Sequence, residues 1–326
     1  MAVFTPVTSA QLRQFLKAYS LGELVALEGI ASGIENSNFF VTTQLEDIKT
    51  RYILTLFERL SHAQLPFYLS MMHHLAKRKV ACPDTLEDKQ GEALQTLNDK
   101  PAALFTCLAG KANMAPRAEH CRQVGTLLAQ MHLAVENFQG GLPNLRGLSW
   151  WNESGPKVLP FLNRSQADLL STELIIQNEF SLGSVYAELP KAAVHADLFR
   201  DNVLFEEHGG QIKLGGAIDF YFAGVDHLIF DMAVTVNDWC IEDGTGAFVP
   251  EHLAAFIQAY CAVRMPSAAE QKAWPLMQRA AALRFWISRL YDFHLPRPAE
   301  MVTPKDPNHF EKILRLRRIQ PQLLNL

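Results

Sequence analysis

Short apolar runs separated by turn residues dominate the first third of the chain, a pattern that predicts strands. Strands are expected over 24–30, 39–43, 51–57, 92–97 and 102–108. Before them, Thr8 and Gln11 have the spacing of a capping box, which predicts a short helix, and residues 65–79 have the apolar spacing of a longer one. Residues 31–38, rich in small and amide side chains, are predicted to form a turn. The pattern therefore predicts an N-terminal lobe of about five antiparallel strands and one main helix.

Beyond this lobe, apolar residues recur every three or four positions, which is typical of helices. The first such stripe runs from Cys121 to Phe138, in a long helix that we expect to open at Pro116. We place the domain boundary before it, between an N-terminal lobe (1–108) and a mainly helical C-terminal lobe (109–326). Further helices are predicted over 165–189, 226–240, 250–263, 267–293 with an interruption at Pro275, and 306–324, with a loop-like connector over 140–160. The fold class expected is α+β.

One strand pair interrupts the helical pattern, over 203–205 and 212–218, with glycines in the turn between them. Asp197 precedes this hairpin, Asn202 begins it and Asp219 ends it. If the hairpin is centred between residues 210 and 211, Asn202 lies opposite Asp219. Two hard oxygen ligands at one rim suit Mg²⁺.

The order His-x-Asp-x-x-x-x-Asn followed by a later Asp is typical of a phosphotransfer centre, in which the first Asp orients a substrate hydroxyl. Any one of these residues is also an ordinary turn former. All three in this order and register favour phosphotransfer, with Asp197 catalytic and Asn202 and Asp219 as metal ligands.

Composition narrows the class of protein further. The formal net charge of −4 and a pI near 6.3 give no reason to expect a nucleic-acid partner or an anionic membrane. No apolar run approaches the length of a spanning helix, and the N-terminus lacks the pattern of a secretion signal. Five cysteines without a C-x-x-C pair fit reduced thiols in the cytoplasm. The expectation is a globular cytoplasmic protein; the sequence leaves its oligomeric state open.

Five motifs in chain order resemble those of the aminoglycoside phosphotransferase and choline kinase superfamily, small-molecule relatives of protein kinases, and within it those of bacterial homoserine kinases. They are Gly33-x-x-Asn36-x-Asn38-Phe39, Tyr52-Ile53-Leu54-Thr55-Leu56-Phe57-Glu58, Val194-His195-x-Asp197-Leu198-x-x-x-Asn202-Val203-Leu204-Phe205, Asp231-x-Ala233-x-x-x-Asn237-Asp238-Trp239-Cys240 and Arg284-Phe285-Trp286-x-Ser288-Arg289-Leu290-Tyr291-Asp292. The resemblance implies a two-lobed protein-kinase-like fold, ATP and Mg²⁺ as cofactors, and L-homoserine of the threonine pathway as the acceptor.

The resemblance also implies that the first lobe binds the nucleotide, with adenine against a hinge at 103–108. The nucleotide-binding residues expected are Ser32, Gly33, Asn36, Asn38, Thr55, Phe105 and Leu108. Thr55 stands where kinases usually have the lysine that pairs with the phosphates. Lys49, Arg51 and Lys111 are the candidates for a replacement cation.

An acceptor that carries both an ammonium and a carboxylate needs side chains of both signs. The substrate-binding candidates are Asp231, Asn237, Asp238 and Trp239 on one predicted helix and Arg284 and Arg289 on another. The two arginines are five positions apart and diverge on a helix, so at most one is expected to contact the acceptor. Arg289 has an alternative partner in Asp292, and Trp239 is equally compatible with the core.

Two other functions remain compatible with the sequence. One is a kinase for a different small alcohol, such as choline, an aminoglycoside or a methylthio sugar. The other is a catalytically silent, nucleotide-binding scaffold with a kinase-like fold, which the missing lysine allows. The retention of Asp197, Asn202 and Asp219 together favours an active kinase.

Overall fold

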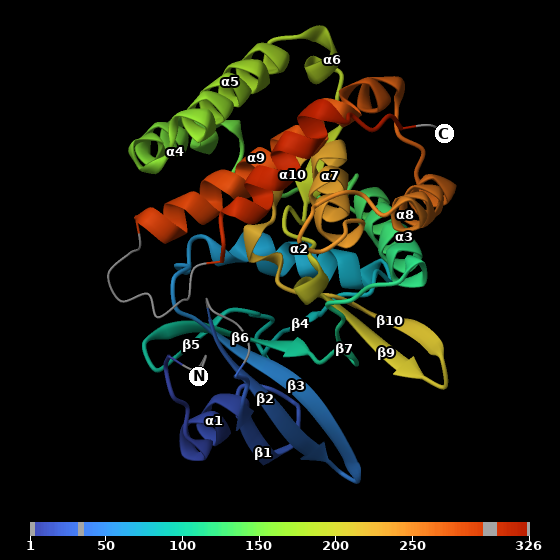
Figure 1. Ribbon diagram of the computed structural model, residues 1–326. Coiled ribbons are helices and arrows are strands. Elements are labelled where there is room, and N and C mark those ends of the chain that lie inside the picture. Colours follow the sequence, from blue (N-terminus) through green and yellow to red (C-terminus); the bar gives the residue numbers. More distant parts are fainter. Residues whose placement is uncertain (1–3, 32–35, 296–304, 325–326) are drawn as a thin grey trace. The chain divides into compact units, whose positions relative to one another are not determined.

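The computed structural model describes residues 4–31, 36–295 and 305–324. It divides into two compact units, Met1–Ala109 and Gly110–Leu326, which we call the first and second units (Figure 1). The predicted domain boundary lies one residue from this division.

An antiparallel sheet forms most of the first unit. Its strands are β1 (Glu23–Gly29), β2 (Asn36–Leu45), β3 (Ile48–Phe57), β4 (Thr85–Leu86), β5 (Gln95–Leu97) and β6 (Lys100–Thr106). They are hydrogen-bonded in the order β1-β2-β3-β6-β4, with β5 also paired to β6. The helices of the unit are α1 (Ser9–Leu16) and α2 (Leu65–Lys77). The central position of β3 between β2 and β6 explains why its second half is the most deeply buried part of the strand.

The short helix α1 begins as the sequence predicts. Thr8 accepts a hydrogen bond from the backbone N–H of Gln11 at 3.2 Å, and the Gln11 side chain accepts one from the backbone N–H of Thr8 at 2.9 Å. This reciprocal pair fixes the first turn. Leu12 and Leu16 then pack with Phe39 and Leu54 of the sheet, and the expected capping box is confirmed.

One local prediction in the first unit is wrong, and one strand was missed. Asn36 and Asn38 belong to β2 rather than to a turn, because the pairing of β2 with β3 extends to Asn36 opposite Phe57. Strand β4 was not predicted, since two residues carry no periodic signal. The glycine-containing part of the predicted turn, with Ser32 and Gly33, lies outside the described residues.

The second unit is mainly helical, as expected. Its helices are α3 (Ala118–Ala134), α4 (Leu148–Val158), α5 (Arg164–Ser181), α6 (Ser184–Ala187), α7 (Leu228–Trp239), α8 (Pro250–Val263), α9 (Ala268–His294) and α10 (Asn308–Ile319). Its short strands are β7 (Lys111–Ala112), β8 (Lys191–Val194), β9 (Val203–His208), β10 (Gln211–Ala217) and β11 (Gly224–His227). Helix α9, the long orange helix of Figure 1, packs against α4, α7 and α10, while α3 packs against α8. The loops that precede β9 and follow β10 are positioned by this helical core.

Three predictions for the second unit need correction. The connector over 140–160 contains α4, which continues through Pro156. Helix α9 is continuous through Pro275, although a proline inside a helix removes a backbone hydrogen bond. Burial of the neighbouring Trp274 and Met277 offsets that cost, which the local sequence does not reveal. The helix expected from residue 226 starts only at Leu228, because the residues before it form β11 and pair with β8.

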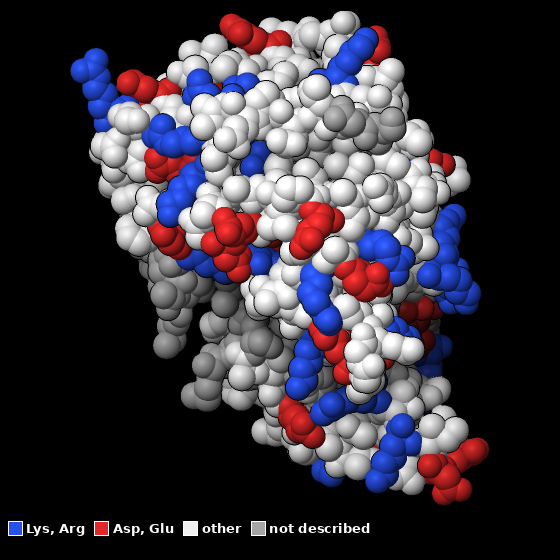
Figure 2. Space-filling model, turned by 45° about the vertical axis from the view of Figure 1, so that its right-hand side comes forward, with Lys and Arg blue, Asp and Glu red and all other residues white. Residues whose placement is uncertain are grey.

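Charged side chains of both signs are interspersed over the face shown in Figure 2. This distribution agrees with the small net charge of −4. Among the described residues, no helix has both the length and the apolar character needed to cross a membrane.

Candidate active site

The hairpin of β9 and β10 sets the position of the predicted metal ligands. Gly209 and Gly210, with φ of 57° and 81°, form a tight turn, which a chain that needs two positive φ angles makes most easily with glycine. The turn pairs Gln211 with His208, and an irregularity before Gly216 then shifts the register by one residue. As a result the backbone of Ile218 donates to the carbonyl of Asn202 at 2.9 Å. The predicted pairing of Asn202 with Asp219 is therefore one residue out of register, and Asp219 follows directly after the paired position.

Asp197 lies in the loop between β8 and β9. The Asn202 amide donates to the backbone carbonyl of Asp197 at 2.9 Å and to its carboxylate at 3.2 Å. The Asp197 side chain is 15 % exposed, and Nη1 of Arg284 is 3.8 Å from its Oδ1. Burial raises the pKa of Asp197 to about 7, against the opposing charges of Arg284 and Arg289. A carboxylate with a pKa near neutrality is suited to accept a proton during a reaction at physiological pH.

The donor set at the rim of the hairpin fits a divalent cation. The Nδ2 atom of Asn202 donates to Asp197, so the Oδ1 atom of Asn202 is the one that can coordinate a cation. Asp219 has φ 63° and ψ 62°, a left-handed conformation that Asp and Asn tolerate better than most residues. No cluster of three His, Cys, Asp or Glu side chains that suits a metal occurs in the described part of the chain. Two oxygen ligands at this rim would leave the remaining coordination positions to phosphates and waters, as Mg²⁺ prefers.

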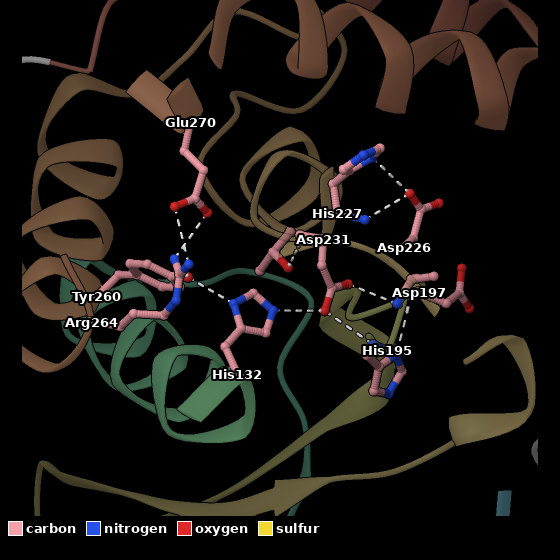
Figure 3. Close-up of polar contacts among 11 residues, drawn as sticks. His132, His195, Asp197, Asp226, His227, Asp231, Tyr260, Arg264 and Glu270 are labelled. Atoms are coloured by element: carbon pink, nitrogen blue, oxygen red, sulfur yellow. Dashed lines mark hydrogen bonds and ion pairs between the residues drawn. The ribbon is translucent and has the colours of Figure 1, made fainter. Parts of the chain in front are cut away.

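Asp231 of α7 holds the loop that carries Asp197 (Figure 3). Its carboxylate accepts hydrogen bonds from the backbone N–H groups of His195 at 3.0 Å and Ala196 at 2.7 Å. Ala196 has φ of 62°, which is strained for a residue with a Cβ. Burial raises the pKa of Asp231, but the hydrogen bond and charge of His132 outweigh this, so the pKa lies below its ordinary value. The ionised carboxylate stabilises the strained turn immediately before Asp197.

The side chain of His195 links the loop that carries Asp197 to the residue that precedes Asp219. Its Nε2 lies 3.0 Å from the carbonyl oxygen of Ile218, and its Nδ1 accepts the backbone N–H of Asp197 at 3.3 Å. Burial lowers the pKa of His195, and the neutral ring has one donor and one acceptor, as these two contacts require. One side chain thereby fixes the backbone of Asp197 relative to the residue before Asp219.

A buried polar chain continues from Asp231 toward α8 and α9 (Figure 3). Nε2 of His132 lies 3.1 Å from Asp231, and its Nδ1 lies 2.7 Å from the hydroxyl of Tyr260. Arg264 donates to the same hydroxyl at 3.0 Å and forms two 3.0 Å hydrogen bonds with Glu270. Both ring nitrogens of the buried His132 therefore have partners inside the second unit. This series of polar contacts connects the loop that carries Asp197 to the helical core of the second unit.

The other substrate candidates on α7 have internal partners. Asn237 donates to the backbone of Gln278 at 2.8 Å and accepts from Arg317 at 2.9 Å. The indole of Trp239 is fully buried and donates to the carbonyl of Leu198 at 3.0 Å. For Asp231, Asn237 and Trp239 we therefore propose positioning roles in place of the predicted substrate contacts, since their polar atoms hold the loop or neighbouring helices.

We predict that Asp231→Ala lowers the free energy of unfolding by about 3 to 5 kcal/mol, the usual cost of removing one partner from a buried charged network. The substitution leaves His132 and two backbone N–H groups without their acceptor. Urea denaturation followed by circular dichroism measures the change. Glu153→Ala, which removes an exposed carboxylate paired with Lys157, is the control and should leave the midpoint unchanged. A similar midpoint for both variants would contradict the positioning role.

In the first unit, the predicted nucleotide-binding residues lie on adjacent strands. Thr55 of β3 is 2 % exposed and donates its hydroxyl to Asn38 of β2 at 2.7 Å. Asn36 and Phe105 are also buried, and Leu108 is half-buried after the end of β6. Thr55 therefore makes a neutral hydrogen bond across the sheet at the position where kinases usually have a lysine.

Of the three candidate replacement cations, Arg51 contacts Glu28 at 3.1 Å and stacks over Phe40. Lys49 and Lys111 are exposed. The structure thus pairs Arg51 with a carboxylate and leaves the two lysines at the surface.

A cavity of about 270 Å³ in the second unit brings two predicted substrate residues together, Asp238 and Arg289. It is also lined by residues that sequence reasoning missed, among them Phe199, Lys305, His309 and Phe310. Phe199 stands at an unspecified position of the motif that contains Asp197. The other three belong to no motif, and the packing of α10 against α9 brings them to Asp238.

Comparison with known proteins agrees with this geometry. The model of the phosphotransferase enzyme family matches residues 26–274. The homoserine kinase of Janthinobacterium sp. (strain Marseille) is 53 % identical over 318 residues, which cover 97 % of this chain and 96 % of that protein. The homoserine kinase of Ralstonia pickettii (strain 12J) is 51 % identical over 319 residues, with the same coverage.

Solved structures resemble the chain at lower identity. The amicoumacin kinase hAmiN superposes with a TM-score of 0.69 at 15 % identity, over 96 % of this chain and 92 % of that one. A microcompartment-associated aminopropanol kinase gives 0.63 at 17 % identity, over 95 % and 97 %. These likenesses confirm the protein-kinase-like α+β fold. The chain belongs to the phosphotransferase enzyme family and, within it, to the group of the homoserine kinases.

Proposed function

We propose that the protein transfers the γ-phosphoryl group of ATP to the side-chain hydroxyl of L-homoserine, giving O-phospho-L-homoserine for threonine biosynthesis. The observation that carries this proposal is the near full-length similarity, at about half identity, to homoserine kinases. The presence of Asp197, Asn202 and Asp219 around one hairpin supports it, because these residues provide a proton acceptor and two oxygen ligands.

In this proposal Asp197 accepts a hydrogen bond from the acceptor hydroxyl and directs its oxygen at phosphorus. Phosphoryl transfer has a loose transition state, so the proton moves late and the carboxylate contributes mainly by orientation. Arg284 stabilises the charged form of Asp197, while burial keeps its pKa high enough for it to take the proton.

Asn202 and Asp219 would hold Mg²⁺. When bound, the ion offsets negative charge on the phosphates. Asn202 has a second role, because its amide orients the Asp197 carboxylate. A neutral His195 holds the backbone of both segments and exchanges no proton with the substrate.

The proposed nucleotide-binding residues of the first unit are Ser32, Gly33, Asn36, Asn38, Thr55, Phe105 and Leu108. Thr55 offers no charge to the phosphates, so bound metal and another cation are expected to supply most of the compensation. The five cysteines are free thiols, which supports a cytoplasmic location.

We predict that L-homoserine has a higher kcat/KM than L-serine or L-threonine, with ADP release as the measurement. Serine is one carbon too short to place its hydroxyl when both charged ends are held, and threonine adds a branch at the reacting carbon. Choline is the contrasting acceptor, since it has no carboxylate. Faster phosphorylation of choline than of homoserine would contradict the proposed acceptor and favour a related kinase activity.

A further inference from the structure

The cavity of about 270 Å³ has walls of mixed character. Phe199 and Phe310 provide apolar surface, with ring centroids 5.9 Å apart. Asp238 comes from the end of α7 and Arg289 from α9. The segment 199–201, which also lines the cavity, continues the loop that carries Asp197. The cavity is therefore built on the same loop as the proposed catalytic base.

Among the cations around this loop, Arg289 differs in having no fixed partner. Arg200 forms ion pairs with Asp238 at 3.3 Å and Asp243 at 3.0 Å, and Lys305 forms one with Asp201 at 3.2 Å. Arg289 makes no hydrogen bond or ion pair within 4.0 Å with any described residue. The alternative pairing with Asp292, expected from the helical spacing, is not formed, although that carboxylate acts on Arg289 from a greater distance.

Arg284, the other candidate, is engaged elsewhere. Its side chain is 3 % exposed, its Nη1 approaches Asp197 at 3.8 Å, and its guanidinium stacks 3.6 Å above the ring of Phe285. Burial lowers its pKa to about 10. Arg284 is thus placed to act on the base, which leaves Arg289 to meet a ligand in the cavity.

The partner of opposite sign is Asp238. Its Oδ2 accepts the backbone N–H of Arg200 at 2.7 Å, whereas no hydrogen bond to its Oδ1 occurs among the described residues. An unpaired cation and an unsaturated carboxylate oxygen line one small cavity together with apolar rings. A zwitterion with a short aliphatic chain matches this combination of groups.

We propose that Arg289 binds the carboxylate of an amino-acid acceptor in this cavity and that Asp238 binds its ammonium group. This inference rests on the proposed function and goes beyond it, because it names the residues that separate an amino-acid alcohol from a simple amino alcohol. The methylenes of the acceptor lie against Phe199 and Phe310, and the hydroxyl points along the loop toward Asp197.

Arg289 has a competing explanation that the experiment must separate. Four carboxylates, those of Asp197, Asp292, Asp201 and Asp238, act on it electrostatically. The alternative is that Arg289 only shifts the pKa of Asp197 and makes no contact with the acceptor. The alternative predicts that substitution of Arg289 lowers kcat/KM equally for every acceptor. A contact with the acceptor carboxylate predicts a loss of kcat/KM only for acceptors that have a carboxylate.

The test compares three acceptors with the full-length wild-type protein and Arg289→Met. L-homoserine has both charged groups, 3-aminopropan-1-ol lacks the carboxylate, and 4-hydroxybutanoate lacks the ammonium. We expect Arg289→Met to lower kcat/KM for L-homoserine on the order of 100-fold, mostly through KM, as for the loss of a charge-assisted pair. The same loss is expected for 4-hydroxybutanoate, with 3-aminopropan-1-ol changed by no more than a few-fold. Calorimetric binding of each acceptor provides a readout that does not depend on turnover.

Arg122→Met is the matched control, since it removes an exposed arginine paired with Glu119 on α3 and should change none of these values. Arg289→Lys keeps the charge and should recover part of the loss. Equal losses for all three acceptors, or no loss for homoserine, would overturn the inference. A wild-type protein that turns over 3-aminopropan-1-ol but not homoserine would instead contradict the proposed function, and calorimetry with 4-hydroxybutanoate would still test Arg289.

Discussion

Asp197→Asn is expected to lower kcat by on the order of 10²- to 10⁴-fold while ATP affinity stays within a few-fold of wild type. Asparagine is nearly isosteric and keeps one accepting oxygen, but it has no charge and cannot take the proton. The hydrogen bond from Asn202 to the backbone of residue 197 remains, so the loop keeps its course. Steady-state kinetics with ATP and homoserine measure kcat, and nucleotide binding by calorimetry measures the affinity.

The pH profile provides an independent reading of the same residue. Asp197 must be ionised to accept a proton, and burial raises its pKa to about 7. Activity of the wild type is therefore expected to fall as the pH drops through about 7. The residual activity of Asp197→Asn should lack this acidic limb.

Asp201→Asn serves as the control, although the structure gives Asp201 contacts of its own. Asp201 is on the same loop, but it pairs with Lys305 and lines the cavity that we propose binds the acceptor. We expect the Asp201 variant to raise KM for the acceptor and leave kcat within a few-fold. Equal losses of kcat in the two variants would show that the loop tolerates no change and would remove the argument for a base at Asp197.

Asp219→Asn is expected to raise the Mg²⁺ concentration needed for half-maximal activity and to lower kcat by on the order of 10³-fold, which corresponds to the several kcal/mol that a catalytic cation provides. Asn is the informative replacement because it tolerates the left-handed backbone at this position. Ala removes both oxygens and adds strain, so Asp219→Ala should abolish turnover. Activity measured across a Mg²⁺ titration gives both quantities.

A matched control for this prediction is Asp226→Asn. Asp226 lies in β11, seven residues further on, and accepts a hydrogen bond from Asn144 at 2.7 Å. Its replacement should leave the Mg²⁺ requirement as in the wild type. A folded Asp219→Asn protein with an unchanged Mg²⁺ requirement would mean that this carboxylate is not a ligand.

Local signals in the sequence were sufficient for several elements. The capping box at Thr8 and the proline at the first position of α8 mark helix starts through interactions within a few residues. The two glycines of the β9–β10 turn predict the hairpin for the same reason. The order of Asp197, Asn202 and Asp219 could be read directly, because all three lie within one continuous segment of the chain.

The register of that hairpin depended on more than its residues. The turn is centred between Gly209 and Gly210, one residue earlier than predicted, which by itself moves the partner of Asn202 back by two residues. The irregularity before Gly216 restores one of these two residues, and no residue pattern announces it. Helix α4 was likewise missed, because Gly155 and Pro156 are poor helix formers. In α9, burial of Trp274 and Met277 overrides the proline that predicted an interruption.

The sequence by itself determined the family and the two kinds of lobe, and it led to the proposed residues of the phosphotransfer centre, since motif order and short-range periodicity carry that information. Only the tertiary structure decided which polar residues line a cavity and which are enclosed by hydrogen-bond partners. Asp231 and Asp238 lie seven positions apart on α7, on the same face of the helix; the first is surrounded by donors from the loop and α3, and the second lines a cavity. The surroundings of Arg284 and Arg289 also differ, because the first approaches Asp197 and the second lines the cavity without a hydrogen-bonded partner among the described residues. The physical reason is that a side chain's role follows from the groups packed around it, and those groups come from segments up to a hundred residues away in the chain.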